Sequence, residues 1–88
     1  MTVKVFEVLN ELGFHARVAS RIVREARNFD SSIIVHRNGR AFDMKNVTGV
    51  IMTGAKNGDS VAIEFDGADE VEAASAFEDL FLSKFGEK

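Results

Sequence analysis

The chain has 88 residues, 45% of them hydrophobic and 28% charged, which suits one small globular domain over residues 1–88. It has no cysteine, so disulfides, thiol catalysis and zinc–thiolate sites are excluded, and its net charge of −3 argues against a nucleic-acid-binding protein. No apolar run approaches the length of a membrane span and the N-terminus lacks a signal-peptide pattern, so we expect a cytoplasmic protein.

The first part of the chain predicts a strand, a turn and a helix. Residues 2–9 are rich in β-formers, although their alternation is imperfect. Gly13 turns the chain, and no Ser, Thr, Asp or Asn stands directly before the run that follows, so His15 falls at or beside a helix N-cap. Residues 16–28 carry apolar side chains at helical spacing, namely Val18, Ala19, Ile22, Val23 and Ala26.

A histidine at a helix start suits chemistry on an anion. The unpaired N–H groups and the positive end of the helix dipole favour negative charge there. An imidazole nucleophile with Arg17 two residues later suits the carriage of a phosphoryl group. The same surroundings disfavour the imidazolium, so we expect a neutral ring near neutral pH. From these two residues alone, an exposed loop histidine without a function is the simpler interpretation.

Basic residues concentrate in the middle of the chain. From residue 15 to residue 45 there are seven Lys or Arg against three Asp or Glu, and from 59 to 88 there are two against nine. A basic stripe on a helix attracts an acidic partner and speeds its association, and a solubilising surface is the alternative. The stripe predicted near one side of the first helix comprises Arg17, Arg21, Arg24 and Arg27.

The central part predicts a hairpin and a short helix. Residues 31–37 form a second strand, and Asn38-Gly39 is a strong signal for a two-residue turn into a strand over 40–43. Asn46 is a natural N-cap for a short helix over Val47, Val50 and Ile51, which Gly54 ends.

The last part predicts a strand and a helix. Residues 61–66 alternate apolar and polar after a turn at Asn57-Gly58, and Asp69 with Glu72 resembles a capping box. The helix stripe expected in the core is Val71, Ala74, Phe77, Leu80 and Phe81, with Gly86 ending the helix. The order βαββαβα predicts an α+β domain with helices on one face of an antiparallel sheet.

These segments together resemble the HPr family, the histidine-containing phosphocarriers of the bacterial phosphoenolpyruvate:sugar phosphotransferase system. Leu-Gly-Phe-His-Ala-Arg, residues 12–17, is the specific part, and the Arg-Asn-Gly-Arg hairpin and the Gly-Ala-Asp-Glu helix entry agree. The resemblance covers essentially the whole chain. It implies an open-faced β-sandwich with a four-stranded antiparallel sheet in the order 1-4-2-3, backed by three helices.

The resemblance also implies roles for particular residues. His15 accepts the phosphoryl group through Nδ1, and Arg17 with the amides near Ala16 holds it. The second helix and the residue before His15 supply an apolar docking surface, although Val47 and Ile51 equally suit the core. The implied binding residues are Phe14, Ala16, Ser20, Arg21, Arg24, Arg27, Val47, Thr48, Ile51 and Met52.

Two positions depart from the family pattern. Val18 stands where the family usually has proline, which adds an N–H donor but gives up a rigid first turn, so transfer efficiency is in question. Asn46 stands where many members carry a regulatory serine, and it has no hydroxyl to phosphorylate. Regulation by an ATP-dependent kinase at this position is therefore not expected.

The expected partners are enzyme I and enzyme IIA-type proteins, with the chain acting as a monomeric carrier rather than an enzyme. We expect no cofactor, no metal site, no nucleic acid and no direct membrane binding. His15 and His36 are far apart in sequence, and no close group of ligands has metal spacing. One alternative is a divergent regulatory binding module of the same fold, inactive in sugar transport. The other is RNA binding, which the basic stripe suggests but the missing aromatic stacking motif opposes.

Overall fold

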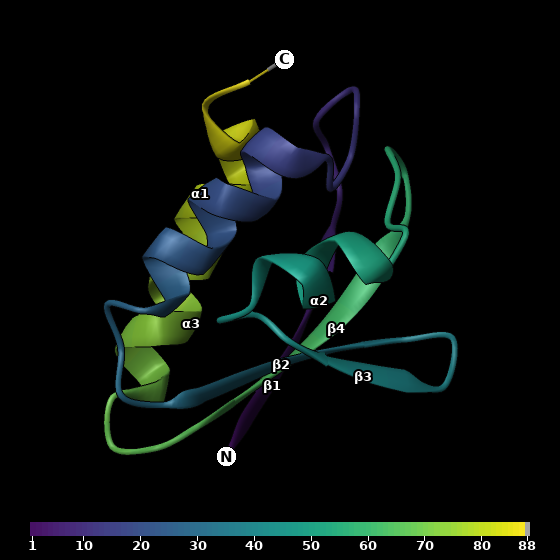
Figure 1. Ribbon diagram of the computed structural model, residues 1–88. Coiled ribbons are helices and arrows are strands. Elements are labelled where there is room, and N and C mark those ends of the chain that lie inside the picture. Colours follow the sequence, from purple (N-terminus) through teal and green to yellow (C-terminus); the bar gives the residue numbers. More distant parts are fainter. Residues whose placement is uncertain (88) are drawn as a thin grey trace.

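The computed structural model describes residues 1–87 and has a four-stranded antiparallel sheet in the order β1-β4-β2-β3 (Figure 1). The strands are β1 (Thr2–Glu7), β2 (Ser32–Arg37), β3 (Arg40–Asp43) and β4 (Ser60–Asp66). The helices are α1 (Ala16–Ala26), α2 (Val47–Met52) and α3 (Glu70–Leu82), followed by the short turn η1 (Lys84–Gly86). The predicted fold class, element order and strand order are confirmed. No helix within residues 1–87 has the length and apolar character needed to cross a membrane.

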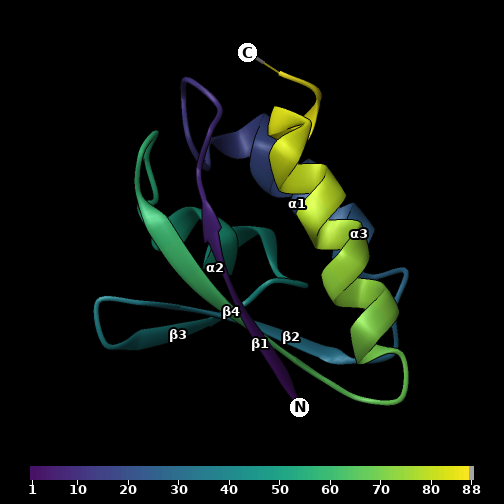
Figure 2. The same cartoon turned by 180° about the vertical axis from the view of Figure 1, so that it is seen from behind.

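The core lies between the helices and one face of the sheet. In β4, Val61, Ile63 and Phe65 are buried while the residues between them are not, as their alternation predicts. In β1, Phe6 faces the core and Val3 and Val5 are exposed on the other face, which explains the imperfect alternation of this segment. Seen from behind, the two long helices α1 and α3 run side by side next to the sheet (Figure 2).

The predicted hairpin and the predicted short helix are both present. Asn38 and Gly39 have φ angles of 53° and 75°, the left-handed values that a two-residue type I′ turn between β2 and β3 requires. The side-chain oxygen of Asn46 accepts a hydrogen bond of 3.1 Å from the Gly49 amide at the start of α2. Local chemistry therefore determines both features.

The C-terminal helix differs from its prediction in three ways. Val71 is 67% exposed, since Ala73 and Ala74 fill the core side of the first turn. Asp69 does not cap its own helix, because its carboxylate accepts hydrogen bonds of 2.9 Å from the backbone amides of Asp30 and Ser31 instead. The helix ends at Leu82 rather than Gly86, and η1 follows with left-handed backbone angles.

Candidate functional site

His15 is the N-cap residue of α1. Its backbone is extended, with φ −81° and ψ 177°, and its carbonyl accepts the first helical hydrogen bond, 2.8 Å from the Ala19 amide. The imidazole makes no capping hydrogen bond, so it leaves the amides of the first turn to another acceptor. The ring is 29% exposed, which leaves it accessible at the helix start, as the sequence predicts.

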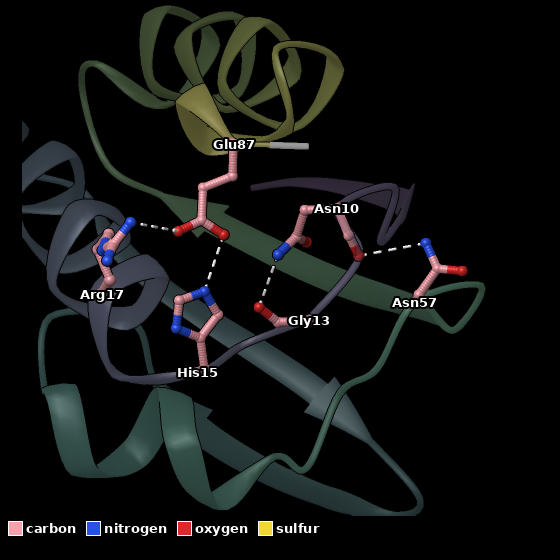
Figure 3. Close-up of polar contacts among 6 residues, drawn as sticks. All are labelled: Asn10, Gly13, His15, Arg17, Asn57 and Glu87. Atoms are coloured by element: carbon pink, nitrogen blue, oxygen red, sulfur yellow. Dashed lines mark hydrogen bonds and ion pairs between the residues drawn. The ribbon is translucent and has the colours of Figure 1, made fainter.

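The loop before His15 is held tightly in place. Gly13 has a φ of +67°, and a Cβ atom at this position would lie 2.5 Å from the carbonyl oxygen of Ala55. The Phe14 amide donates to that same oxygen at 3.0 Å. The buried Asn10 amide group donates to the Gly13 carbonyl at 2.8 Å, and the Asn57 side chain donates to the Asn10 carbonyl at 3.2 Å (Figure 3). These contacts fix the backbone of the loop, and therefore the position of His15, relative to the rest of the fold.

The carboxylate of Glu87 contacts the imidazole, a neighbour that sequence reasoning missed. His15 Nε2 lies 2.8 Å from Glu87 Oε1, and an Arg17 guanidinium nitrogen lies 3.7 Å from Glu87 Oε2 (Figure 3). The hydrogen bond from His15 is the main reason that the pKa of the Glu87 carboxyl lies below its usual range, and Arg17 adds to this effect. The side chains of His15 and Arg17 therefore both contact Glu87, and the three form one cluster, the His15 group.

These three residues line a surface hollow together with Glu11, Leu12 and Gly86. Leu12 is 71% exposed and offers an apolar side chain beside the ring. Phe14 does not: it is buried and packs against Phe81 with ring centroids 6.0 Å apart. The prediction that Phe14 belongs to an exposed docking surface is therefore wrong, because the left-handed Gly13 directs the chain so that Phe14 enters the core.

The arginines of the basic stripe lie in different surroundings. Arg17 is 84% exposed and shares a carboxylate with His15. Arg21 pairs with Glu25 at 3.4 Å, and the guanidinium of Arg27, just beyond the end of α1, donates to the carbonyl of Lys45 at 3.0 Å. Arg24 and Ser20 are exposed on α1. The structure thus brings only Arg17 of the stripe into the His15 group.

The predicted apolar surface of α2 is mostly present. Thr48, Ile51 and Met52 are exposed, whereas Val47 is partly buried and packs against the core. α2 lies against α1, the helix that begins directly after His15 (Figure 1). Val47 and Ile51 suited either the core or the docking surface. Ile51 is exposed to solvent, whereas Val47 contributes to both the core and the surface.

Within residues 1–87, no group of three or more His, Asp or Glu side chains is arranged to hold a metal ion. The site itself offers side chains and backbone amides. A partly exposed imidazole, a neighbouring guanidinium and uncapped helix amides suit the transient attachment of an anionic group to the ring.

Comparison with known proteins agrees with this geometry. The family model described as "PTS HPr component phosphorylation site" matches residues 2–83. "Phosphocarrier protein HPr" of Treponema pallidum is 42% identical over 88 residues, which cover 100% of both chains. The crystal structure of HPr-C-His from Thermoanaerobacter tengcongensis superposes with a TM-score of 0.95 at 36% identity, covering 100% of this chain and 99% of that one. A crystal structure described as an HPr dimer from the same organism gives a TM-score of 0.79 at 37% identity, covering 99% of this chain and 100% of that one. The chain belongs to the HPr family of phosphocarriers, the proteins that carry phosphoryl groups in the phosphotransferase system.

Proposed function

We propose that His15 is the residue that carries the phosphoryl group, which it accepts through Nδ1 from phosphorylated enzyme I and passes to an enzyme IIA-type domain. The observation that carries this proposal is the position of His15 as an N-cap whose side chain leaves the first-turn amides uncapped. An N-cap side chain normally satisfies the N–H of the second or third helical residue. A phosphoryl group on the ring has the oxygen atoms to take that role.

Charge and positioning supply the rest of the transfer. A phosphoryl group brings up to about two negative charges to the helix start, where the backbone dipoles and Arg17 stabilise it. Arg17 is exposed and its contact with Glu87 is long at 3.7 Å, so the guanidinium is available to an incoming phosphate at little cost. Transfer between two histidines needs alignment and electrostatic stabilisation and requires no cofactor.

Partners dock on the exposed face of α2 and at the start of α1 in this proposal. Thr48, Ile51 and Met52 offer an exposed, largely apolar face on α2, and α2 packs against α1, whose first turn carries Arg17. Such a combination suits brief contact with several acidic partners in turn. Since the same face meets each partner, we propose that the chain acts as a monomer.

Incubation with phosphoenolpyruvate and the cognate enzyme I tests the proposal. We expect an acid-labile phosphate on the protein that His15→Ala abolishes. His36→Ala is the matched control, because His36 is exposed on the sheet and pairs with Glu64, and it should keep the label. Absence of label on the folded protein, or equal labelling of the His15→Ala variant, would refute the assignment and favour a regulatory binding module.

A further inference from the structure

The chain after α3 turns back on itself in an unusual conformation. Lys84, Phe85 and Gly86 have φ angles of 57°, 57° and 77°. Left-handed backbone is unfavourable for an L-residue, so two consecutive non-glycine residues adopt it only where other contacts enforce it. The turn brings the next residue, Glu87, to the ring of His15, 72 positions away in sequence.

An aromatic cluster enforces the turn. The Phe85 side chain is buried, with its ring centroid 4.8 Å from that of Phe81 and 5.9 Å from that of Phe14. Burial of an aromatic ring stabilises by an amount that offsets the backbone cost. The position of Glu87 is therefore determined by core packing rather than by the chance placement of a surface side chain.

The carboxylate determines which ring nitrogen carries the proton. Glu87 accepts only, because its lowered pKa keeps it ionised, so the nitrogen 2.8 Å from it must donate. That nitrogen is Nε2. A neutral imidazole has a single N–H, so protonation of Nε2 leaves Nδ1 with its lone pair. Nδ1 lies on the side of the ring away from Glu87 (Figure 3).

We propose that Glu87 is a positioning residue for phosphoryl transfer, whose carboxylate holds the His15 ring with Nε2–H donated to it and Nδ1 free to attack. This inference rests on the proposed role of His15. A carboxylate that orients a catalytic histidine through its second nitrogen is a general device for selecting one tautomer.

The same contact stabilises the product of the step. The Nδ1 lone pair forms a bond to phosphorus as the phosphorus–nitrogen bond of the donor phosphohistidine breaks, and the donor ring keeps that electron pair. His15 then bears the phosphoryl group on Nδ1 and a proton on Nε2, so its ring is positively charged. Glu87 lies at the nitrogen that shares this charge, and no proton has to move during the transfer.

Substitutions at Glu87 test separately whether the hydrogen-bond acceptor or the negative charge of this side chain orients the His15 ring. Glu87→Ala removes the acceptor, Glu87→Gln keeps an acceptor oxygen without the charge, and Asp79→Asn is a control that removes an exposed acid from the last turn of α3. The nitrogen chemical shifts of the His15 ring, measured by NMR in the unphosphorylated protein above the pH at which the ring is protonated, report the tautomer. Loss of one charge-assisted hydrogen bond predicts a rise of about tenfold in the ratio of the Nδ1–H to the Nε2–H tautomer in Glu87→Ala. Glu87→Gln restores most of the wild-type ratio, and Asp79→Asn leaves it unchanged.

Kinetics with phosphorylated enzyme I provide the second measurement. We expect Glu87→Ala to lower kcat for phosphoryl acceptance about tenfold with little change in KM, since Glu87 acts through the ring rather than through docking. An unchanged tautomer ratio in Glu87→Ala would overturn the inference while leaving the carrier function intact. Failure of the wild-type protein to accept phosphate would refute the carrier function, and the tautomer measurement would still decide whether Glu87 orients the ring.

Discussion

Phe14 and Phe85 pack edge to face with their ring centroids 5.9 Å apart, and this contact joins the two segments that form the site. Phe14 directly precedes His15, and Phe85 stands two residues before Glu87. Both rings also contact Phe81 of α3, so three buried aromatic side chains connect the segment before His15 with the turn before Glu87. The distance between the imidazole and its carboxylate is thereby set by the core.

Truncation of Phe85 tests this link. Phe85→Ala leaves a cavity and releases the left-handed turn, and we predict a loss of about 3–5 kcal/mol in the free energy of unfolding, measured by urea denaturation. Phe85→Leu fills most of the space and should lose less. Equal stability of the Ala variant and the wild type would show that the ring does not hold the turn.

Gly13 and Gly39 allow two effects of a glycine substitution to be compared, namely the cost of left-handed backbone and the cost of a steric clash. Both have left-handed backbone, with φ of +67° and +75°, but only at Gly13 would a Cβ atom meet neighbouring backbone, 2.5 Å from the Ala55 oxygen. We predict that Gly39→Ala costs about 1–2 kcal/mol in the free energy of unfolding and Gly13→Ala about 3 kcal/mol or more. If urea denaturation gave equal losses, the close approach at Gly13 would not be a constraint on the loop.

Several features were predictable from the sequence because short stretches of residues carry a pattern for them. The alternation of Val61, Ile63 and Phe65, the Asn38-Gly39 turn and the Asn46 cap are each signalled by a pattern within a few residues. Asp69 illustrates the limit: its spacing from Glu72 fits a capping box, yet its carboxylate bonds the amides of residues 30 and 31 across the fold. A hydrogen-bond partner that is distant in sequence cannot be predicted from the residues around Asp69.

Glu70 makes the stability of the fold sensitive to acid. Hydrogen bonds from the Thr2 hydroxyl at 2.6 Å, the terminal amine and the Gly67 amide lower the pKa of Glu70 from 4.5 to about 2. A lowered pKa stabilises the folded state above the unfolded value, and this stabilisation is lost as the pH falls from about 4.5 through about 2. We predict that the melting temperature of Glu70→Gln falls less over this range than that of the wild type.

Glu72→Gln is the matched control for the pH series, since Glu72 is exposed in the same first turn of α3. This variant should keep the acid sensitivity of the wild type. If Glu70→Gln melted with the same pH dependence as Glu72→Gln, the contacts of Glu70 would not contribute to the acid transition.

Asn46 is predicted to act as a helix cap. Asn46→Ala removes the acceptor for the Gly49 amide and should cost about 1 kcal/mol in the free energy of unfolding. Asn46→Ser keeps a capping oxygen, so its loss in the free energy of unfolding should be only a few tenths of that of Asn46→Ala.

Because the wild-type side chain has no hydroxyl, we also expect no labelling at this position by an ATP-dependent protein kinase. A stable Ala variant, or label at residue 46, would contradict these expectations.

The reactive part of the site was predictable and its surroundings were not. The position of His15 at a helix start follows from the turn at Gly13 and the periodicity of residues 16–28. Glu87 was missed, because the turn that brings it back uses left-handed backbone at Lys84 and Phe85, residue types for which sequence predicts continued helix. Phe14 was misplaced because its neighbours Phe81 and Phe85 come from the far end of the chain.

Phosphorylation of His15 at Nδ1 is measured most directly by NMR of the nitrogen-15-labelled protein before and after treatment with phosphoenolpyruvate and enzyme I. We predict phosphorus coupling at Nδ1 of His15, with the largest amide shifts at the start of α1, in Ala16, Arg17 and Val18. Phosphorus on Nε2 or on His36, or amide shifts that leave the start of α1 unchanged, would contradict this account of the site.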